Sequence, residues 1–185
     1  MFPVLETERL TLREIVKEES AQLLTDLYDF LKKDASLVHP FQFYAGVSYR
    51  NIFIAQDLDE RVEGFPPHDH VGRRAKDCPI EALCPEAAPT AAYLNKITEK
   101  SRDFLMKHPI NQKRIADGKD PGNSIWLWSG GYRPKMWTYK ERFGLNGAVI
   151  SAVDLIRGIG VYAGLDIIHV PGATGLFNTN LPFRI

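Results

Sequence analysis

The last third of the chain constrains the fold most, because it alternates between the two regular periodicities. Residues Ala148–Ile150 form a short apolar run typical of a strand, Ala152–Ala163 has helical spacing, and Asp166–Val170 is apolar again. A strand, a helix and a second strand in this order imply a parallel strand pair joined by a right-handed crossover. The sequence therefore predicts an α/β fold that ends in a parallel unit.

The first 55 residues predict further strands and one long helix. Arg9–Ile15 alternates polar and apolar residues as a half-buried strand does, and Lys17–Lys33 carries leucines on one helical face. We expect two more strands, at Phe41–Tyr44 and Tyr49–Ile54. These segments extend the α/β prediction to the amino-terminal region.

Residues 57–88 are rich in proline, glycine and charge and predict a long irregular connection. A helix should begin near Pro89, with Tyr93, Leu94, Ile97, Phe104 and Leu105 on its buried face, and should end at His108-Pro109. A short helix is expected at 111–116, stopped by Gly118.

The segment after residue 123 predicts a strand followed by a turn. Ser124–Trp128 has the apolar character of a short strand, which would point Trp126 and Trp128 to the same face. Gly130 and Gly131 would allow positive φ and a close backbone approach in a turn that presents Arg133.

Charge and cysteine usage narrow the functional classes. The 23 basic and 23 acidic residues balance, so the chain has no global field that would attract nucleic acid or an anionic membrane. Cys78 and Cys84 lack metal-ligand spacing and are expected to be free thiols in a reducing compartment. No apolar run approaches the roughly 20 residues of a membrane span, and no signal peptide is apparent. We expect a cytoplasmic protein.

Six segments in consistent order resemble the middle of the archaeal-type 2,3-bisphosphoglycerate-independent phosphoglycerate mutases, a branch of the alkaline phosphatase superfamily. The resemblance covers about residues 41–180. The segments are Phe43–Arg50, Pro66–Asp69, His108–Arg114, Asn123–Pro134, Lys140–Gly160 and Pro171–Gly175 with Asn178–Asn180.

The resemblance implies a division into three parts. Residues 1–40 are a strand and a helix of uncertain origin, 41–140 a mixed-sheet cap that holds the substrate, and 141–185 a partial segment of a phosphatase-like α/β core. In complete members, two divalent metals (Mn, Mg or Zn) and a serine nucleophile transfer the phosphoryl group between the 3- and 2-positions of phosphoglycerate, a step of glycolysis. Segments resembling the metal ligands and the serine are missing here, so we expect no turnover by this chain alone and no catalytic residue within it.

The transferable roles are therefore substrate-binding ones. Arginine forks and lysines grip phosphate and carboxylate groups, and the matched motifs contain several such cations. The predicted substrate-binding residues are Arg50, His68, Asp69, Lys113, Arg114, Arg133 and Lys140. Taken singly, each arginine is better explained as a solvated surface charge, and His68-Asp69-His70 could equally be a plain loop turn. A metal site there is the least favoured alternative, because adjacent residues seldom converge on one ion.

Two other functions stay open. Residues 2–15 resemble the opening strand of GCN5-related N-acetyltransferases, although the nearest segment to their acetyl-CoA loop, Arg157–Tyr162, departs from that pattern. A non-catalytic protein that binds phosphate esters is the third possibility. The incomplete sheet also predicts association through exposed edges at 148–150 and 167–170, with another copy or with a complementing core chain.

Overall fold

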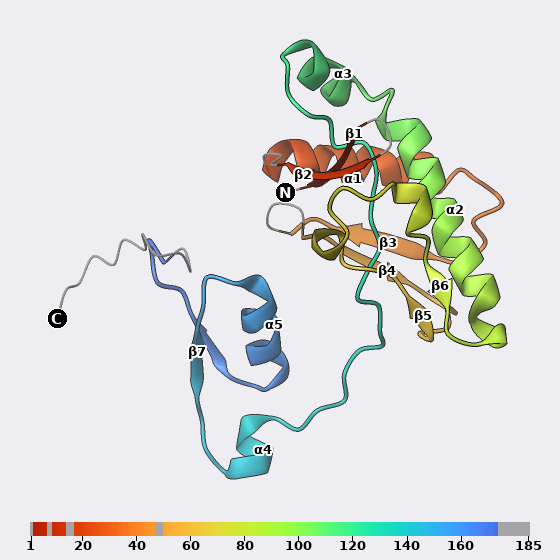
Figure 1. Cartoon of the computed structure of the whole chain (residues 1–185). Helices are drawn as coiled ribbons and strands as arrows, with labels where there is room; N and C mark the ends of the chain where they lie inside the picture. The colour runs from red at the N-terminus through yellow and green to blue at the C-terminus, as the bar shows by residue number, and fades with distance from the viewer. Residues whose placement is uncertain (1, 7–8, 14–16, 47–49, 174–185) are drawn as a thin grey trace. The chain divides into compact units, whose positions relative to one another are not determined.

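The computed structural model describes residues 2–6, 9–13, 17–46 and 50–173, with the backbone alone for residues 2–6, 9–13 and 17. The chain divides into two compact units, Met1–Tyr132 and Arg133–Ile185, which are taken separately below (Figure 1). The motif residues 174–180 lie outside the described part. Among the described residues, no helix is long and apolar enough to cross a membrane.

Two helices build the core of the first unit. Helix α1 spans Lys17–Leu31 and helix α2 spans Ala88–Leu105, and the two pack against each other. Leu27, Leu31 and Ile97 are fully buried between them. Each such side chain contributes about 1.5–3 kcal/mol of transfer free energy on burial. Both helices agree with the apolar spacing in the sequence, although α2 ends at Leu105, three residues before His108.

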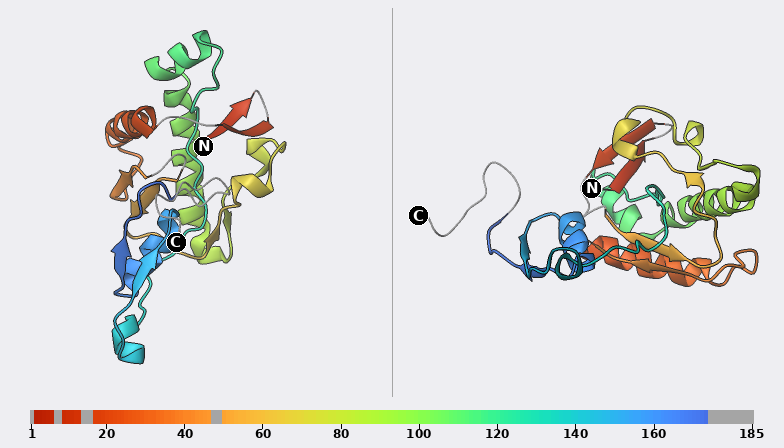
Figure 2. Two further views of the ribbon diagram at one scale, coloured as in Figure 1. Left: turned by 90° about the vertical axis from the view of Figure 1, so that its left-hand side faces the viewer. Right: turned by 90° about the horizontal axis from the view of Figure 1, so that it is seen from below.

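Three separate antiparallel strand pairs accompany these helices. The pairs are β1 (Phe2–Glu6) with β2 (Arg9–Arg13), β3 (Phe41–Tyr44) with β4 (Ile52–Ala55), and β5 (Val62–Glu63) with β6 (Glu81–Ala82). Strand β3 lies along α1 (Figure 2), and Phe41, Phe43 and Phe53 pack on the core. The mixed sheet predicted for residues 41–140 is not formed by the described residues, because β3 pairs only with β4 and β5 only with β6.

The long connection between β4 and α2 is irregular, as predicted, and side chains of α2 hold it in place. It contains the 3-10 turns η1 (Pro67–Asp69), η2 (Ala75–Asp77) and η3 (Pro85–Ala87). The Asn95 side chain accepts from Ile80 N and donates to Ile80 O, both at 2.9 Å, and Thr90 Oγ1 accepts from Asp59 N at 3.0 Å. These bonds supplement the short β5–β6 ladder, the strand pairing described within this connection.

The predicted strand at Ser124–Trp128 is not formed. The chain leaves helix α3 (Pro109–Ala116), passes Gly118 at φ +71°, and runs without helix or strand to Thr138. Its buried backbone bonds to side chains instead: the amide of Ile125 donates to Ser101 Oγ at 3.1 Å. An apolar run therefore became a buried extended segment, because a neighbouring helix offered the acceptor that a strand would have supplied.

The second unit contains the predicted strand–helix–strand arrangement. It comprises α4 (Tyr139–Phe143), β7 (Ala148–Ile150), α5 (Asp154–Tyr162) and β8 (Asp166–Ile168), and β7 pairs with β8 in parallel. Gly160 lets α5 approach the strands closely, since a Cβ there would lie 2.5 Å from Val149 Cγ1. The parallel pair and its helix confirm the α/β prediction for this part of the chain.

Candidate functional site

Two of the motif segments meet in the first unit, around the turn that contains His68 and Asp69. Trp126 Nε1 donates to Phe65 O at 2.7 Å, and the Trp128 ring lies 5.5 Å from the His68 ring, at an interplanar angle of 81°. The contact brings together residues about 60 positions apart in the chain. The predicted shared face of Trp126 and Trp128 is therefore replaced by two distinct contacts, both with the 65–68 segment.

His68 and Asp69 themselves face solvent. Their side chains are 50% and 64% exposed, and His68 Nε2 lies 3.9 Å from Asp69 Oδ1. Pro67 beneath them is fully buried and anchors the turn. Both polar side chains can therefore contact a ligand, while the buried Pro67 fixes the backbone of the turn.

Arg50 is exposed and lies two residues before β4. The amide of Gly46 donates to Asn51 Oδ1 at 3.0 Å, and a Cβ on Gly46 would lie 2.1 Å from Arg50 O. The missing side chain of Gly46 therefore allows the backbones of Gly46 and Arg50 to lie close together.

The two cations predicted on α3 are already engaged. Lys113 Nζ bonds Asp117 at 2.8 Å, which raises the pKa of Lys113 and lowers that of Asp117. Arg114 is largely buried, with bonds of 2.5 Å to Glu19 Oε2 and 2.8 Å to Asp120 O. Arg114 therefore serves as a link between α1 and the end of α3.

Two further residues of the same motif are structural. His108 Nε2 lies 3.0 Å from Asp26 Oδ2, and its Nδ1 accepts from Ile110 N at 3.3 Å, which caps the start of α3. The Asn111 side chain is fully buried and bonds Leu105 O, Gly122 O and Gly122 N at 2.7–2.9 Å. The residues of the 108–114 motif thus connect α3 to α1 and to the segment around Gly122.

Arg133 and Lys140 belong to the second unit. The Arg133 guanidinium lies 5.5 Å from the centre of the Tyr162 ring, within cation–π range, and Lys140 is exposed on α4. Neither Gly130 nor Gly131 has φ in the left-handed region, and a Cβ on either would meet no atom within 4 Å. The predicted role of these glycines is therefore wrong: the positive φ of this turn, +53°, falls on Ser129.

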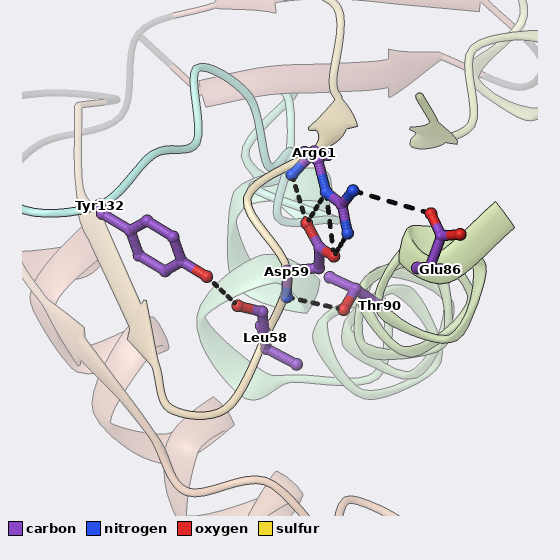
Figure 3. Close-up of polar contacts among 6 residues, drawn as sticks. All are labelled: Leu58, Asp59, Arg61, Glu86, Thr90 and Tyr132. Atoms are coloured by element: carbon purple, nitrogen blue, oxygen red, sulfur yellow. Dashed lines mark hydrogen bonds and ion pairs between the residues drawn. The ribbon is translucent and has the colours of Figure 1, made fainter. Parts of the chain in front are cut away.

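A hollow that the sequence did not predict lies elsewhere in the first unit. It measures about 430 Å³ and is lined by Asp57, Leu58, Asp59, Glu60, Arg61 and Tyr132. Arg61 bonds Asp59 at 2.6 Å and lies 3.7 Å from Glu86, while Tyr132 Oη donates to Leu58 O at 3.0 Å (Figure 3). Because carboxylates surround its single cation, this hollow is poorly suited to an anionic substrate.

The Asp59–Arg61 pair makes the stability of the first unit sensitive to acid. The bonds from Arg61 lower the pKa of Asp59 to about 2, from an ordinary 3.8. A lowered pKa stabilises the fold above pH 3.8, and this contribution is lost as the pH falls through about 2.

We expect Asp59→Asn to make the free energy of unfolding fall less steeply between about pH 4 and pH 2, measured by urea titrations monitored by circular dichroism. An unchanged pH slope would contradict this role, and Arg61→Gln should reproduce the effect of the substitution.

Metal ligation finds no support in the described part of the chain. Among those residues, no group of three or more histidine, cysteine, aspartate or glutamate side chains could hold a metal ion. His68, Asp69 and His70 accordingly do not form such a group. Residues that fit the two metals implied by the family resemblance are thus not found in this segment.

Comparison with known proteins identifies the family. Residues 7–111 match the sequence model of 2,3-bisphosphoglycerate-independent phosphoglycerate mutase. The chain belongs to this family. The matched range includes most of residues 1–40, for which the motifs indicated no mutase resemblance, and leaves only residues 2–6 of the acetyltransferase-like segment outside it.

Relatives extend the similarity over most of the chain. The phosphoglycerate mutase of Methanosarcina acetivorans is 42% identical over 166 residues, which are 89% of this chain and 39% of that protein. A probable mutase of Geobacter sulfurreducens is 46% identical over 145 residues, covering 78% of this chain and 35% of the relative. The chain thus spans about 40% of the length of the relatives it matches.

Solved structures agree at the level of the fold. The cofactor-independent phosphoglycerate mutase of Thermoplasma acidophilum superposes with a TM-score of 0.58 at 23% identity, over 92% of this chain and 46% of that one. A Pyrococcus horikoshii protein gives a TM-score of 0.62 at 22% identity, over 97% and 39% of the two chains. The described arrangement of short sheets and helices is therefore that of a partial mutase fold.

Proposed function

We propose that this chain provides the phosphoglycerate-holding region of a 2,3-bisphosphoglycerate-independent phosphoglycerate mutase. The observation that carries the proposal is the family match, which includes the motif segments at 43–50 and 66–69 and the first four residues of the segment at 108–114. The ligand is a phosphate ester that also bears a carboxylate, and the interconversion of 3- and 2-phosphoglycerate is the reaction the region would serve.

The residues proposed to hold the ligand form two sets, one in each unit. Arg50, His68 and Asp69 belong to the first unit, and Arg133 and Lys140 to the second; all five are exposed. A planar guanidinium can grip a phosphate or a carboxylate at two points, which suits Arg50 and Arg133 to this role. Lys113 and Arg114 are lesser candidates, since Asp117 and Glu19 already pair with them.

We further propose that the chain is inactive alone. It covers about 40% of the length of its relatives, and its described residues contain no group of three or more side chains that could hold a metal ion. Activity would then require a complementing core, which could pair with the exposed edges of β7 and β8. We also propose a cytoplasmic location and self-association of the chain.

Isothermal titration of 3-phosphoglycerate into the purified chain tests ligand binding. We expect binding in the millimolar range or tighter, weakened at least about tenfold by Arg133→Ala, because a charged ligand loses a two-point contact. Arg142→Ala is the matched control: it removes an exposed arginine of α4 whose guanidinium lies over Phe143, 5.3 Å from the ring centre. No heat at millimolar ligand, or equal weakening by both substitutions, would contradict the proposed site.

A second ligand separates the mutase-type site from general phosphate-ester binding. Glycerol 3-phosphate lacks the carboxylate of 3-phosphoglycerate but keeps the phosphate and the carbon chain. Weaker binding of glycerol 3-phosphate is expected if arginines grip both anionic groups. Equal affinity for the two compounds would favour a non-catalytic protein that recognises phosphate esters.

A further inference from the structure

The turn that carries His68 is held by an unusually close backbone approach at Gly64. A Cβ built on Gly64 would lie 2.4 Å from Leu127 O and 3.1 Å from Trp128 Cα. Both of these atoms belong to the backbone, so neither could rotate away from an added methyl group. Residue 64 must therefore be glycine for the 126–128 segment to lie where it does.

We infer that Gly64 is a positioning residue for His68. By omitting a side chain, it allows the backbone at Leu127 and Trp128 to close on the chain that enters η1. Closure places the Trp128 ring against the His68 imidazole at 5.5 Å. Gly64 itself contributes no group to a ligand; it acts through the segment that packs on it.

A second contact holds the same two segments together. The bond from Trp126 Nε1 to Phe65 O, 2.7 Å long, lies next to Gly64 in the chain and fixes the register between 64–66 and 126–128. This side-chain-to-backbone bond holds the Trp126 indole against the chain next to Gly64. Gly64 thus allows the 126–128 backbone to lie close, the Trp126 hydrogen bond stabilises that contact, and the Trp128 ring packs against His68.

The consequence for a ligand rests on the proposed function. An exposed imidazole on a surface turn samples several rotamers, whereas one seated against an indole keeps a preferred orientation. Pre-orienting a contact residue lowers the ordering cost of binding. Gly64 would thereby strengthen the contact of His68 with phosphoglycerate without touching it.

Nuclear magnetic resonance of the intact chain tests the inference without any ligand. Labelling the histidine Cε1 positions gives one resonance for each of the five histidines, and His68→Gln assigns that of His68. Trp128→Leu then defines how far the indole shifts that resonance. We expect Gly64→Ala to move the His68 signal to its position in Trp128→Leu.

Gly130→Ala is the matched control for this experiment. A Cβ on Gly130 meets no atom within 4 Å, so the His68 signal should keep its wild-type position. The signal of His108, which is held by Asp26, reports whether the first unit remains folded. A wild-type His68 signal in folded Gly64→Ala would overturn the inference.

Trp126→Phe decides the question if Gly64→Ala fails to fold. It keeps an aromatic ring but removes the Nε1 donor to Phe65 O, so the His68 signal should move in the same direction as in Trp128→Leu. No movement of the His68 signal in Trp126→Phe would overturn the inference.

Titration of 3-phosphoglycerate on the same samples separates this inference from the proposed function. If the wild-type chain binds, Gly64→Ala should bind about tenfold more weakly, the effect of losing one well-placed polar contact. Equal affinity alongside a moved His68 signal would overturn the link to the ligand. Failure of the wild-type chain to bind would overturn the proposed function, while the His68 signal would still decide the role of Gly64.

Discussion

Replacing Asn111 by alanine is expected to lower the free energy of unfolding of the first unit by about 3 kcal/mol. Its buried side chain makes three hydrogen bonds to backbone groups of Leu105 and Gly122, each worth roughly 1 kcal/mol. Alanine would leave those backbone groups buried without partners, so the loss could exceed this sum. Urea unfolding monitored by far-ultraviolet circular dichroism measures the change.

The neighbouring Gln112 supplies the control for that experiment. It lies on the same helix and also bonds a backbone carbonyl, Met106 O at 2.6 Å, but it is exposed to water. Water can replace that bond, so Gln112→Ala should change the unfolding free energy by no more than about 0.5 kcal/mol. Similar values for the two variants would show that Asn111 does not act as a buried clamp.

The second large effect is expected at Arg114, which we interpret as a structural cation. Breaking a buried ion pair by removing one partner costs about 3–5 kcal/mol. Because the Glu19 side chain is 35% exposed, water should reduce this cost, and we expect Arg114→Ala to destabilise the first unit by about 2–3 kcal/mol. Thermal and urea unfolding both measure it.

A double-mutant cycle with Glu19→Gln isolates the contribution of the pair itself. Lys113→Ala serves as the comparison, since Lys113 is 76% exposed and its surface pair should contribute less than about 1 kcal/mol. Full stability of Arg114→Ala together with lost phosphoglycerate binding would return Arg114 to the substrate site.

Local pattern was sufficient to predict helices α1, α2, α3 and α5 and the parallel unit, but not α4. In α2, the predicted apolar face is buried in the structure at Tyr93, Leu94, Ile97 and Leu105, with Phe104 partly buried. The spacing of these residues reports directly which side of a helix faces the core. The same holds for the alternation of strand and helix after residue 147.

Prediction failed where non-local hydrogen bonds decided the local structure. The apolar run at 124–128 satisfied the pattern of a strand, yet the amide of Ile125 found a side-chain acceptor on α2, Ser101 Oγ. A strand needs a partner strand, and no local pattern reveals whether one will be present. The mixed sheet was wrongly predicted for the same reason.

The candidate site shows the same limit. Motif resemblance selected His68 and Asp69, which the structure places on one surface turn, but it gave no sign that Gly64 and Trp126 support that turn. It also grouped Arg114 with the substrate residues, because a motif marks a residue without saying whether a carboxylate such as Glu19 will pair with it. Charge and motif predicted seven substrate-binding residues. Contacts between segments far apart in the sequence determine what each of these side chains touches, and a motif does not report those contacts.

The packing of α5 on its strands implies an uneven distribution of local stability along the chain. Of the described residues 133–173, Gly160 alone is buried, whereas α1 and α2 bury an extended apolar cluster. Segments with few buried contacts open at low free energy, well below that of global unfolding. Amide protons of β7 and β8 should therefore exchange with solvent deuterium rapidly, through brief local openings. Those of α2 should exchange slowly, only when the whole first unit unfolds.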